Sequence, residues 1–415
     1  MNRDSEPDRP PTDQEVVVDR QGPADTETDQ DSQPLVASSN RRRRLMGLTL
    51  ALLPLGLFML YIGIQGDNVD LAIYRGALTD MLHGNSVYTF SVPMPELKTN
   101  MGFVYPPFAS LVMLPLALVS HVASKALLAV VTTVLVVVAL VGCFSVVDAR
   151  RQAAGRREVS LIIWALVSIL IAISIPTVAN MHLGQVSFAV AALVLIDVTL
   201  LPPRWRGVLV GLAGAIKLTP MILVPYYVVT RQWRAALNAC GAFGFAAVIG
   251  AIFRWPDSVR YWLQRDVIGN SQGDLAHWDN WSIYGDLSRL GLNGSTLHIS
   301  WVIGSAIVLC FAAWRSSRHF LQGQELEATL IMGISAGLVT VVTWTHHLLL
   351  PVVACALLAI RRPAIGIPAL VVVTVAGYLT FSIGFVVVPL MVAFVIFGMP
   401  GNLQERRRVE SGDPS

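Results

Sequence analysis

This chain is expected to be an all-α polytopic membrane protein because of its composition, its long apolar runs and the spacing of its basic residues. Hydrophobic residues make up 54% of the 415 residues and charged residues only 14%, and the mean hydropathy is +0.60. Soluble domains carry about 25% charged residues, so a soluble protein is excluded. The basic residues form short clusters between apolar runs, which is typical of membrane orientation and not of nucleic-acid binding.

The N-terminal segment differs in composition from the rest of the chain. Residues 1–40 are rich in Asp, Glu, Pro, Gln, Ser and Thr, a mixture that buries too little apolar surface to fold. Arg41 to Arg44 then precede an apolar run of about 20 residues, which is long enough to span a bilayer. No small-residue cleavage site follows, so we expect an uncleaved first span. The sequence predicts a disordered cytoplasmic tail at 1–44, a transmembrane domain at 45–400 and a second cytoplasmic tail at 401–415.

Short basic segments recur between the apolar runs and set the expected orientation of each crossing. They lie at 41–44, 148–158, 202–206, 231–234, 315–319, 361–363 and 405–408. The positive-inside rule places all of them in the cytoplasm. The run 122–147 must then carry the chain inward, so the preceding run 104–120 is expected to be a juxtamembrane or re-entrant helix on the outer side. Pro106 and Pro107 open it, because proline starts a helix well but cannot continue one.

The segment 207–230 lies between two basic segments, so it has to enter and leave the membrane on the same side. We expect a hairpin of two short helices with Lys217 and Pro220 at its apex. Single crossings are expected at 159–178, 185–201, 235–253, 298–314, 326–343, 347–360, 364–380 and 383–399. The total is about twelve transmembrane helices with both termini in the cytoplasm.

Polar and potentially reactive side chains gather on the outer face in this topology, in loops at about 65–121 and 254–297 and in two outer turns. They include Asp67, Asp70, Tyr74, Arg75, His83 and Tyr88 in the first loop, Asn180, His182 and Gln185 in the turn at 179–185, and His346 and His347 in the turn at 344–347. A transporter is expected to place its ionisable groups near the bilayer midplane, often in two matching halves. The sequence shows no internal repeat, so an enzyme at the outer membrane surface fits better.

Five segments in this order carry a resemblance to a known family. They read VDLAIYRGALTDMLHGNSVY, FVYPPFASLVMLPLAL, HLGQVSFAVAALVLID, GVLVGLAGAIKLTPMILVPYYVVTRQWR and WTHHLLLPVVA. The series resembles glycosyltransferase family 87 over roughly residues 65 to 360. That family comprises GT-C mannosyltransferases that depend on polyprenol phosphate mannose, including mycobacterial enzymes of phosphatidylinositol mannoside and lipomannan synthesis. The resemblance implies a GT-C fold with outer juxtamembrane helices, a lipid-phosphate sugar donor and a catalytic Asp in the first outer loop.

Asp70 is the position that matches the family's catalytic Asp, and Asp67, three residues upstream, is the fallback. Glycosyl transfer from a β-linked polyprenyl phosphate sugar needs a base to take the proton of the acceptor hydroxyl, and a carboxylate can do that. Inversion at the anomeric carbon then gives an α-linked product. The alternative interpretation of Asp70 is a solvated residue in the first turn of a helix.

The departing polyprenyl phosphate gains negative charge, so cationic or hydrogen-bonding groups are needed opposite the base. His346, His347 and Lys217 are the donor phosphate-binding candidates. The histidines can instead form an interfacial pair without a ligand, and Lys217 can extend toward the membrane surface. Both interpretations stay open for these residues.

The remaining site candidates are expected to shape the acceptor site or the cavity. They are Tyr74, Tyr88, Tyr105, His182, Gln185 and Trp281. No DxD motif of the nucleotide-sugar type is present, so we expect neither a metal nor another cofactor. The four cysteines lie in apolar runs without a paired spacing, so no zinc site is indicated either.

The expected activity is the inverting transfer of mannose from polyprenyl phosphate mannose to a glycolipid acceptor in the cell membrane, on its extracytoplasmic face. The resemblance alone implies the α-(1→2) linkage and a phosphatidylinositol mannoside or lipomannan-like acceptor. Membrane lipids are the other expected partners, and nucleic acid is not. The alternatives are a GT-C enzyme that uses another polyprenyl-phosphate sugar, such as arabinose, and a lipid or sugar-lipid transporter.

Overall fold

The computed structural model describes residues 32–95, 99–264 and 274–375, together with Met391 and Phe394. The chain divides into two compact units, residues 1–44 and 45–415, and the fold described here is that of the second unit. Both predicted tails fall largely outside the described residues, as do most of the expected span at 383–399 and the middle of the loop at 254–297. Within the predicted N-terminal tail, residues 32–44 are helical.

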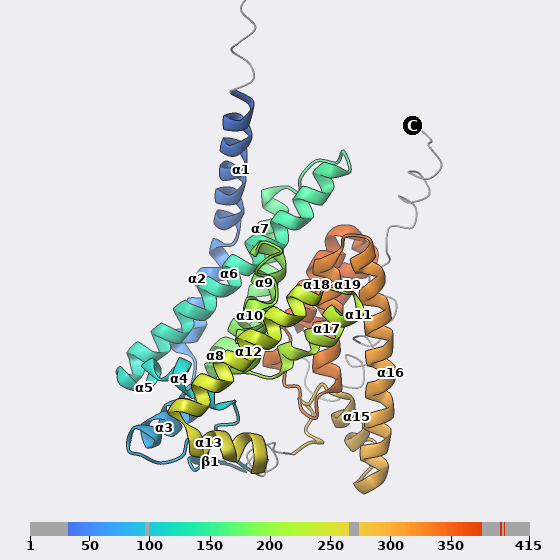
Figure 1. Cartoon of the computed structure of the whole chain (residues 1–415). Helices are drawn as coiled ribbons and strands as arrows, with labels where there is room; N and C mark the ends of the chain where they lie inside the picture. The colour runs from blue at the N-terminus through green and yellow to red at the C-terminus, as the bar shows by residue number, and fades with distance from the viewer. Residues whose placement is uncertain (1–31, 96–98, 265–273, 376–390, 392–393, 395–415) are drawn as a thin grey trace, which may run out of the picture. The chain divides into compact units, whose positions relative to one another are not determined.

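Helices dominate the described residues, apart from a two-stranded antiparallel hairpin that pairs Ser91 with Gly102 (Figure 1). The elements of the first half are α1 (Ser32–Ala51), α2 (Leu53–Gln65), α3 (Val69–Leu82), β1 (Ser91–Met94), β2 (Thr99–Gly102), α4 (Pro107–Met113), α5 (Pro115–Leu118), α6 (His121–Ala153), α7 (Leu161–Ala172), α8 (Ile175–Leu183) and α9 (Ser187–Leu200).

The second half begins with the segment expected to form a hairpin. Its elements are α10 (Val208–Ile216), the 3₁₀ helix η2 (Thr219–Ile222), α11 (Leu223–Val229), α12 (Trp233–Phe253), α13 (Trp255–Val259), the π-helical turn η3 (Arg260–Gln264), α15 (Ile283–Arg289), α16 (Gly294–Leu321), α17 (Glu325–Val339), the 3₁₀ turn η4 (Thr345–His347), α18 (Leu349–Arg361) and α19 (Pro363–Val375).

Long apolar helices confirm the class of a helical membrane protein. Among the described residues, four helices are long and apolar enough to cross a bilayer, at Asn40–Gln65, His121–Ala153, Trp233–Phe253 and Gly294–Leu321. The bent pair α7 and α8 makes a fifth if it counts as one span, and further apolar helices are shorter. The count of about twelve spans is therefore not confirmed.

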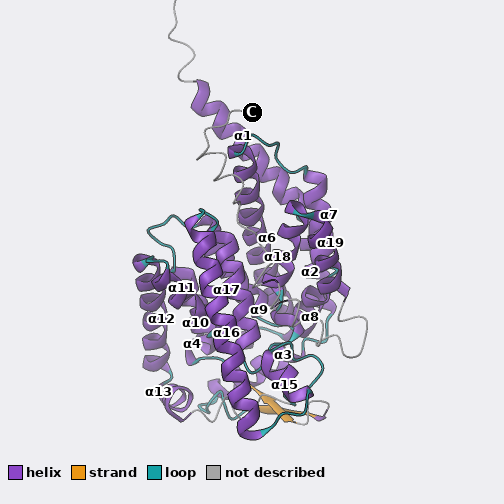
Figure 2. Ribbon diagram, turned by 90° about the vertical axis from the view of Figure 1, so that its right-hand side faces the viewer, coloured by secondary structure: helices purple, strands orange, loops and turns teal. Residues whose placement is uncertain are grey.

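The segments expected on the outer side lie together at one end of the helical bundle. In two views at right angles, α3, the β hairpin, α13 and α15 occupy the same end (Figures 1 and 2). The segment predicted not to cross forms two short helices, α4 and α5. The first begins at Pro107, directly after Pro106, where a missing proline N–H costs no helical hydrogen bond.

The segment 207–230 forms the predicted hairpin, and its direction follows from close glycine contacts. Gly207 and Gly211 of α10 lie against the backbone of Ala235 and Ala239 of α12, so these two helices run parallel from a common end. The chain leaves α11 only a few residues before α12 begins, so α11 has to return to that same end. Lys217 lies at the turn between the two arms.

The structure adds a bend to the expected crossing at 159–178 and corrects the expected outer turn at 179–185. The helix bends by 56° between α7 and α8, and α8 continues to Leu183, so Asn180 and His182 lie on a helix. The hydroxyls of Ser174 and Thr177 each donate to the carbonyl of Ile171 at 2.7 Å. At the bend the carbonyl of Ile171 lacks its usual helical partner, and these hydroxyls supply hydrogen bonds to it instead. A buried carbonyl needs such partners inside a membrane, where no water is available.

The core of the bundle lies among α2, α6, α7, α9, α17 and α18, where apolar side chains are buried. A buried carboxylate also connects three of these helices. Glu327 of α17 is 1% exposed; Arg150 of α6 donates to both its oxygens at 2.5 and 2.6 Å, and Arg361 of α18 forms a further ion pair. Because a buried charge needs partners, these arginines fix the position of α17 between its neighbours.

Candidate active site

Helix α3, which lies outside the spanning segments, carries Asp70 in its first turn. It starts at Asn68, a buried residue in the left-handed conformation with φ of 54°. The side-chain amide of Asn68 donates to the carbonyls of Gly63 and Gly66, at 3.1 and 2.7 Å, and its backbone N–H donates to the carbonyl of His182 at 2.8 Å. These bonds hold the start of α3 against the ends of α2 and α8.

Gln185, in the turn between α8 and α9, lies next to the Asp70 carboxylate and acts to lower its pKa. Its side-chain oxygen accepts from the hydroxyl of Tyr105 at 3.1 Å and from the hydroxyl of Ser187 at 3.4 Å. Because both donors point at the amide oxygen, the amide NH₂ group is the one that faces Asp70. Gln185 is thus held in one orientation and donates to the carboxylate.

Three tyrosines support this arrangement. The hydroxyls of Tyr74 and Tyr105 lie 2.8 Å apart, and both residues are buried. Tyr74 lies one turn after Asp70, so the two share a face of α3. Tyr88 donates to the backbone carbonyl of Tyr105 at 2.8 Å, and Phe103 packs edge-on against Tyr74 and Tyr105. The Tyr105 hydroxyl is therefore fixed by packing as well as by hydrogen bonds.

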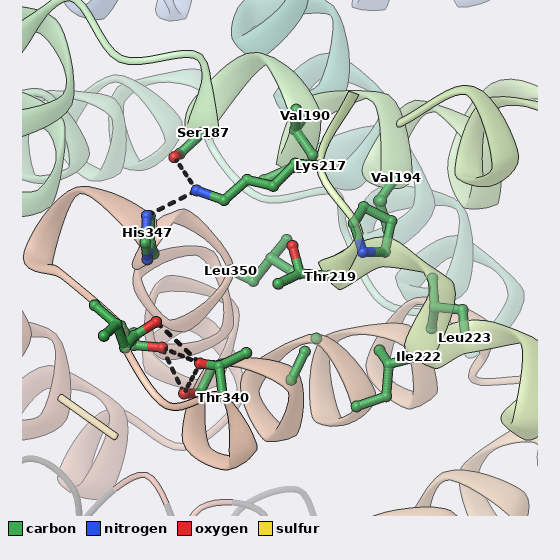
Figure 3. Close-up of a pocket in the computed structure, with 17 residues that line it drawn as sticks. Ser187, Val190, Val194, Lys217, Thr219, Ile222, Leu223, Thr340, His347 and Leu350 are labelled. Atoms are coloured by element: carbon green, nitrogen blue, oxygen red, sulfur yellow. Dashed lines mark hydrogen bonds between the residues drawn. The ribbon is translucent and has the colours of Figure 1, made fainter. Parts of the chain in front are cut away.

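Lys217 extends from the hairpin apex into this network (Figure 3). Its Nζ lies 2.9 Å from the hydroxyl oxygen of Ser187 and 2.7 Å from Nε2 of His347. It also lies 5.8 Å from the centre of the Tyr105 ring, within the range of a cation–π interaction. The amine of Lys217, at the apex of the hairpin, therefore contacts side chains of both α9 and η4.

The turn η4 places both histidines close to Lys217. His346 and His347 contact each other edge-on with ring centres 4.5 Å apart. The backbone N–H of Trp344 donates to Nδ1 of His347 at 3.2 Å. His346 is 6% exposed, and its Nε2 has no hydrogen-bond partner within the described part of the chain. A buried nitrogen without a partner is costly, so this ring is suited to bind a ligand.

Trp281 and Asp279 hold the turn η4 in place through hydrogen bonds to Thr345. The indole N–H of Trp281 donates to Asp279 and to the hydroxyl of Thr345, both at 2.8 Å, and Thr345 also donates to Asp279. The backbone N–H of Trp281 donates to the carbonyl of Thr343 at 2.7 Å. Trp281 is only 3% exposed, so it shapes the site from within the packed protein.

A cavity of about 110 Å³ that is partly open to the outside lies beside Lys217 and His347 (Figure 3). Its walls come from α9, η2, α17, α18 and the segment before η4. The lining side chains are mostly apolar and include Val190, Val194, Ile222, Leu223 and Leu350. An apolar cavity with an amine and an imidazole at one wall is suited to an amphiphile with an anionic group.

The surroundings of Asp70 change its acidity. Burial raises the pKa of its carboxyl from the usual 3.8 to about 6, while the hydrogen bond from Gln185 and the charge of Lys217 act in the opposite direction. A carboxylate with a pKa near 6 is still ionised at neutral pH and is a better proton acceptor than an exposed one.

The structure brings together most of the residues that the sequence singled out. Asp70, Tyr74, Tyr105, Gln185, Lys217, His346 and His347 form one connected region. Asp67 lies apart from it and forms an ion pair with His182 at 3.1 Å. Tyr88 and Trp281 support the region from behind. Ser187, which sequence reasoning missed, joins Gln185 to Lys217, and its position two residues after Gln185 was the available signal.

Comparisons with known proteins identify the family of the chain. The profile of glycosyltransferase family 87 matches residues 103–345. Two relatives, from Mycobacterium tuberculosis and Mycolicibacterium smegmatis, are polyprenol-phosphate-mannose-dependent alpha-(1-2)-phosphatidylinositol mannoside mannosyltransferases. Each is 29% identical to this chain over 74% of its residues. The match covers 74% of the M. tuberculosis protein and 73% of the M. smegmatis protein. A third, a pentamannoside mannosyltransferase of the same type from M. smegmatis, is 29% identical over 77% of this chain and 76% of its own.

No solved structure matches the chain closely enough to be counted as similar. The family profile covers more than half of the sequence, including Tyr105, Gln185, Lys217 and Thr345. The chain belongs to glycosyltransferase family 87.

Proposed function

We propose that this glycosyltransferase transfers mannose from polyprenyl phosphate mannose to a phosphatidylinositol mannoside or lipomannan-like glycolipid, with inversion and an α-(1→2) linkage. The names of the relatives support the donor, the acceptor class and the linkage. The observation that carries the proposal is the hydrogen-bonded series from Gln185 beside Asp70, through Ser187, to Lys217 at the cavity wall. It joins a carboxylate base to a phosphate-binding group at the wall of an open, mostly apolar cavity.

Asp70 is the base in this mechanism. It takes the proton of the acceptor hydroxyl while that oxygen attacks the anomeric carbon of mannose from the face opposite the phosphate. The bond between the anomeric carbon and the phosphate oxygen breaks, and its electron pair leaves with the phosphate. Gln185 holds the carboxylate in place, so the base is already oriented before the reaction begins.

The donor phosphate binds at Lys217, His346 and His347 in this proposal. Nε2 of His346 has no partner within the described residues, and an anionic oxygen is a suitable one. The polyprenyl chain enters the apolar cavity, where it is removed from water and held next to the amine. Charge that develops on the leaving phosphate meets groups already in position.

The acceptor approaches from the side of α3. Tyr74 and Tyr105 form the wall next to the base, Tyr88 supports Tyr105, and Trp281 holds the opposite turn. The Asp67–His182 pair lies at the exposed rim, where the two side chains are 76% and 45% exposed. The tyrosines, His182 and Trp281 shape the acceptor site in our proposal, whereas Asp67 stays outside it, and none of these residues takes the proton.

The proposal includes a GT-C architecture of about twelve spans in the cell membrane, with an extracytoplasmic active site and cytoplasmic termini. It also includes a reaction without a metal ion or other cofactor, because the positive charge at the phosphate comes from side chains. Transfer in the presence of a chelator should equal transfer without it. Loss of activity with the chelator, restored by a divalent cation, would contradict this part of the proposal.

The deciding experiment is incubation of the purified protein with radiolabelled polyprenyl phosphate mannose and a series of phosphatidylinositol mannosides, followed by linkage analysis. We expect labelled glycolipid with an α-(1→2) bond from the wild type and none from Asp70→Asn. Polyprenyl phosphate arabinose serves as the competing donor. Transfer of arabinose and not mannose would assign the other sugar, and movement of intact donor across the membrane without transfer would indicate a transporter.

A further inference from the structure

The hydrogen atoms around His347 can be assigned from its two partners. Nδ1 accepts from the backbone N–H of Trp344 at 3.2 Å. A backbone N–H is always a donor, so Nδ1 carries no hydrogen of its own. A neutral imidazole has one N–H, which must then be on Nε2. That hydrogen points at Nζ of Lys217, 2.7 Å away.

The amine of Lys217 therefore has to accept a hydrogen bond, which an ammonium group cannot do. An uncharged amine fits every contact: its lone pair accepts from His347, and one of its N–H groups donates to Ser187 at 2.9 Å. The Ser187 hydroxyl donates in turn to Gln185, and the Gln185 amide donates to Asp70. The direction of the series is fixed by the backbone donor of Trp344 at its start.

Several groups face Lys217 from the elements packed around it. They are Asp70 of α3, Tyr105 before α4, Ser187 of α9, and His346 and His347 of η4. The charge of Asp70 favours an ammonium group, but the carboxylate is already met by the Gln185 amide. The nearest neighbour, His347, offers Lys217 a hydrogen and no lone pair.

We propose that Lys217 is an uncharged amine in the empty site, gains a proton when the donor phosphate binds, and returns that proton to the leaving phosphate as a general acid. This inference rests on the proposed function. Asp70 takes the acceptor proton, the new glycosidic bond forms, and the bond to phosphate breaks. The phosphate oxygen that receives the electron pair takes the proton of Lys217, so polyprenyl phosphate leaves as a monoanion. Asp70 then loses its proton to water, and Lys217 is again uncharged.

Charged Lys217 no longer accepts from His347, so the Nε2 hydrogen of His347 becomes available to the phosphate. When the donor binds, the hydrogen bond between His347 and Lys217 is lost. The Nε2–H group of His347 and the ammonium group of Lys217 then each donate to the phosphate. The same change explains how a buried amine can avoid a net charge until its counter-ion is present.

The first test measures the charge of Lys217 without any donor. The purified protein is treated with acetic anhydride over a pH series, and acetylation of each lysine is followed by mass spectrometry. Lys125 is an internal reference, because it donates to the carbonyl of Gly66 at 2.8 Å and has no such constraint. We expect half-maximal acetylation of Lys217 at least about two pH units below that of Lys125, because only the uncharged amine reacts. Equal midpoints would overturn the proposal.

A variant separates the effect of His347 from that of burial. In His347→Phe the cavity stays apolar but the N–H that points at Lys217 is gone. We expect the acetylation midpoint of Lys217 to rise toward that of Lys125 while the midpoint of Lys125 stays unchanged. A Lys217 midpoint that remains low in this variant would show that His347 does not hold the amine uncharged, against the proposal.

The second test measures proton uptake when polyprenyl phosphate mannose binds, by calorimetry in two buffers of different ionisation enthalpy. The wild type should take up about one proton per donor, and its dissociation constant should rise about tenfold per pH unit above the Lys217 midpoint. Lys217→Arg, which is always charged, should bind without uptake. If the wild type binds and transfers mannose without uptake, the general-acid role is wrong and the mannosyltransferase function stands. If acetylation behaves as expected but no mannose is transferred, only the proposed function fails.

Discussion

Asp67 and Asp70 are three residues apart, with Asp67 just before α3 and Asp70 in its first turn, and their surroundings differ. The Asp67 side chain is 76% exposed and pairs with His182 at the rim of the site. Asp70 is partly buried, receives a hydrogen bond from Gln185 and interacts with Lys217. The residue that has lost most of its water is the one with its acidity shifted toward neutrality, which distinguishes the two as candidate bases.

Asp70→Asn keeps the volume of the side chain but cannot accept a proton. We expect the rate of the chemical step to fall by on the order of 10²- to 10⁴-fold, the usual contribution of a general base, in single-turnover mannosyl transfer. Asp67→Asn is the matched control and should stay within about twofold of wild type, because an exposed ion pair contributes little. Near wild-type transfer by Asp70→Asn, with a large loss in Asp67→Asn, would make Asp67 the base.

The pH profile follows from the pKa of Asp70, which burial raises to about 6. The ionised form is the active base, so kcat/KM should decrease about tenfold per pH unit below about pH 6. Above the Lys217 midpoint kcat/KM should decrease again, because donor binding then requires proton uptake. The residual rate of Asp70→Asn, measured in parallel, should lack the decrease on the acid side. A wild-type profile that is flat down to about pH 4 would mean that the base has an unshifted pKa or that another group takes the proton.

Helical elements were predictable where length and proline placement decide the outcome. The pair Pro106-Pro107 and the short run after it predicted helices that do not cross, and the basic residues on both sides of 207–230 predicted the hairpin. The bend between α7 and α8 was missed, although Pro176 in the first turn of α8 was an available signal, because proline cannot continue a helix. The hydroxyls of Ser174 and Thr177, which donate to the carbonyl of Ile171, could not be foreseen.

The composition of the candidate site was predictable to a similar extent. Residue types and their outer location pointed to Asp70, Lys217 and the two histidines. Their contacts were not predictable, because Lys217 and His347 are 130 positions apart and meet only through the packing of the hairpin against η4. Ser187 was missed because a serine at the start of a helix usually serves as a cap.

The contact between α10 and α12 sets the position of Lys217 and can be tested on its own. A Cβ atom on Gly211 would overlap the carbonyl oxygen of Ala239, whereas Gly244 on α12 has open space around it. Gly211→Ala should destabilise the protein by about 1–3 kcal/mol, the usual cost of overpacking, and lower the transfer rate by displacing Lys217. Thermal unfolding and transfer assays measure the two effects.

Gly244→Ala adds the same methyl group to a helix of the same bundle, and it should change the free energy of unfolding by no more than about 0.5 kcal/mol. Equal stability and activity of both variants would show that the backbone contact at Gly211 does not hold the hairpin.

Charge is distributed unevenly over the whole molecule. The ends of α6 and α16 that carry Arg150, Arg151, Arg315 and Arg318 lie away from the end that holds α3, α13 and α15 (Figure 1). With the positive-inside rule, this separation predicts that the candidate active site faces the extracytoplasmic side.

Single cysteines at two exposed alanines test this orientation in intact cells. Ala276→Cys lies in the segment before α15, and Ala154→Cys follows α6. A membrane-impermeant maleimide should modify Ala276→Cys and leave Ala154→Cys unmodified until the membrane is permeabilised, with the parent protein as the background. The reverse pattern would place the candidate site in the cytoplasm and exclude the proposed orientation.

The bend after α7 also has a consequence for the surrounding lipid. Helix α7 has 12 residues, which at about 1.5 Å per residue is about 18 Å, against a hydrocarbon core of about 30 Å. Its outward side chains, such as Ile162 and Leu166, are exposed and face acyl chains. A bilayer beside a short apolar helix thins to match it. We therefore expect the headgroup region next to α7 to lie closer to the end of α8, where His182 and Asp67 lie, than it does beside the longer helices.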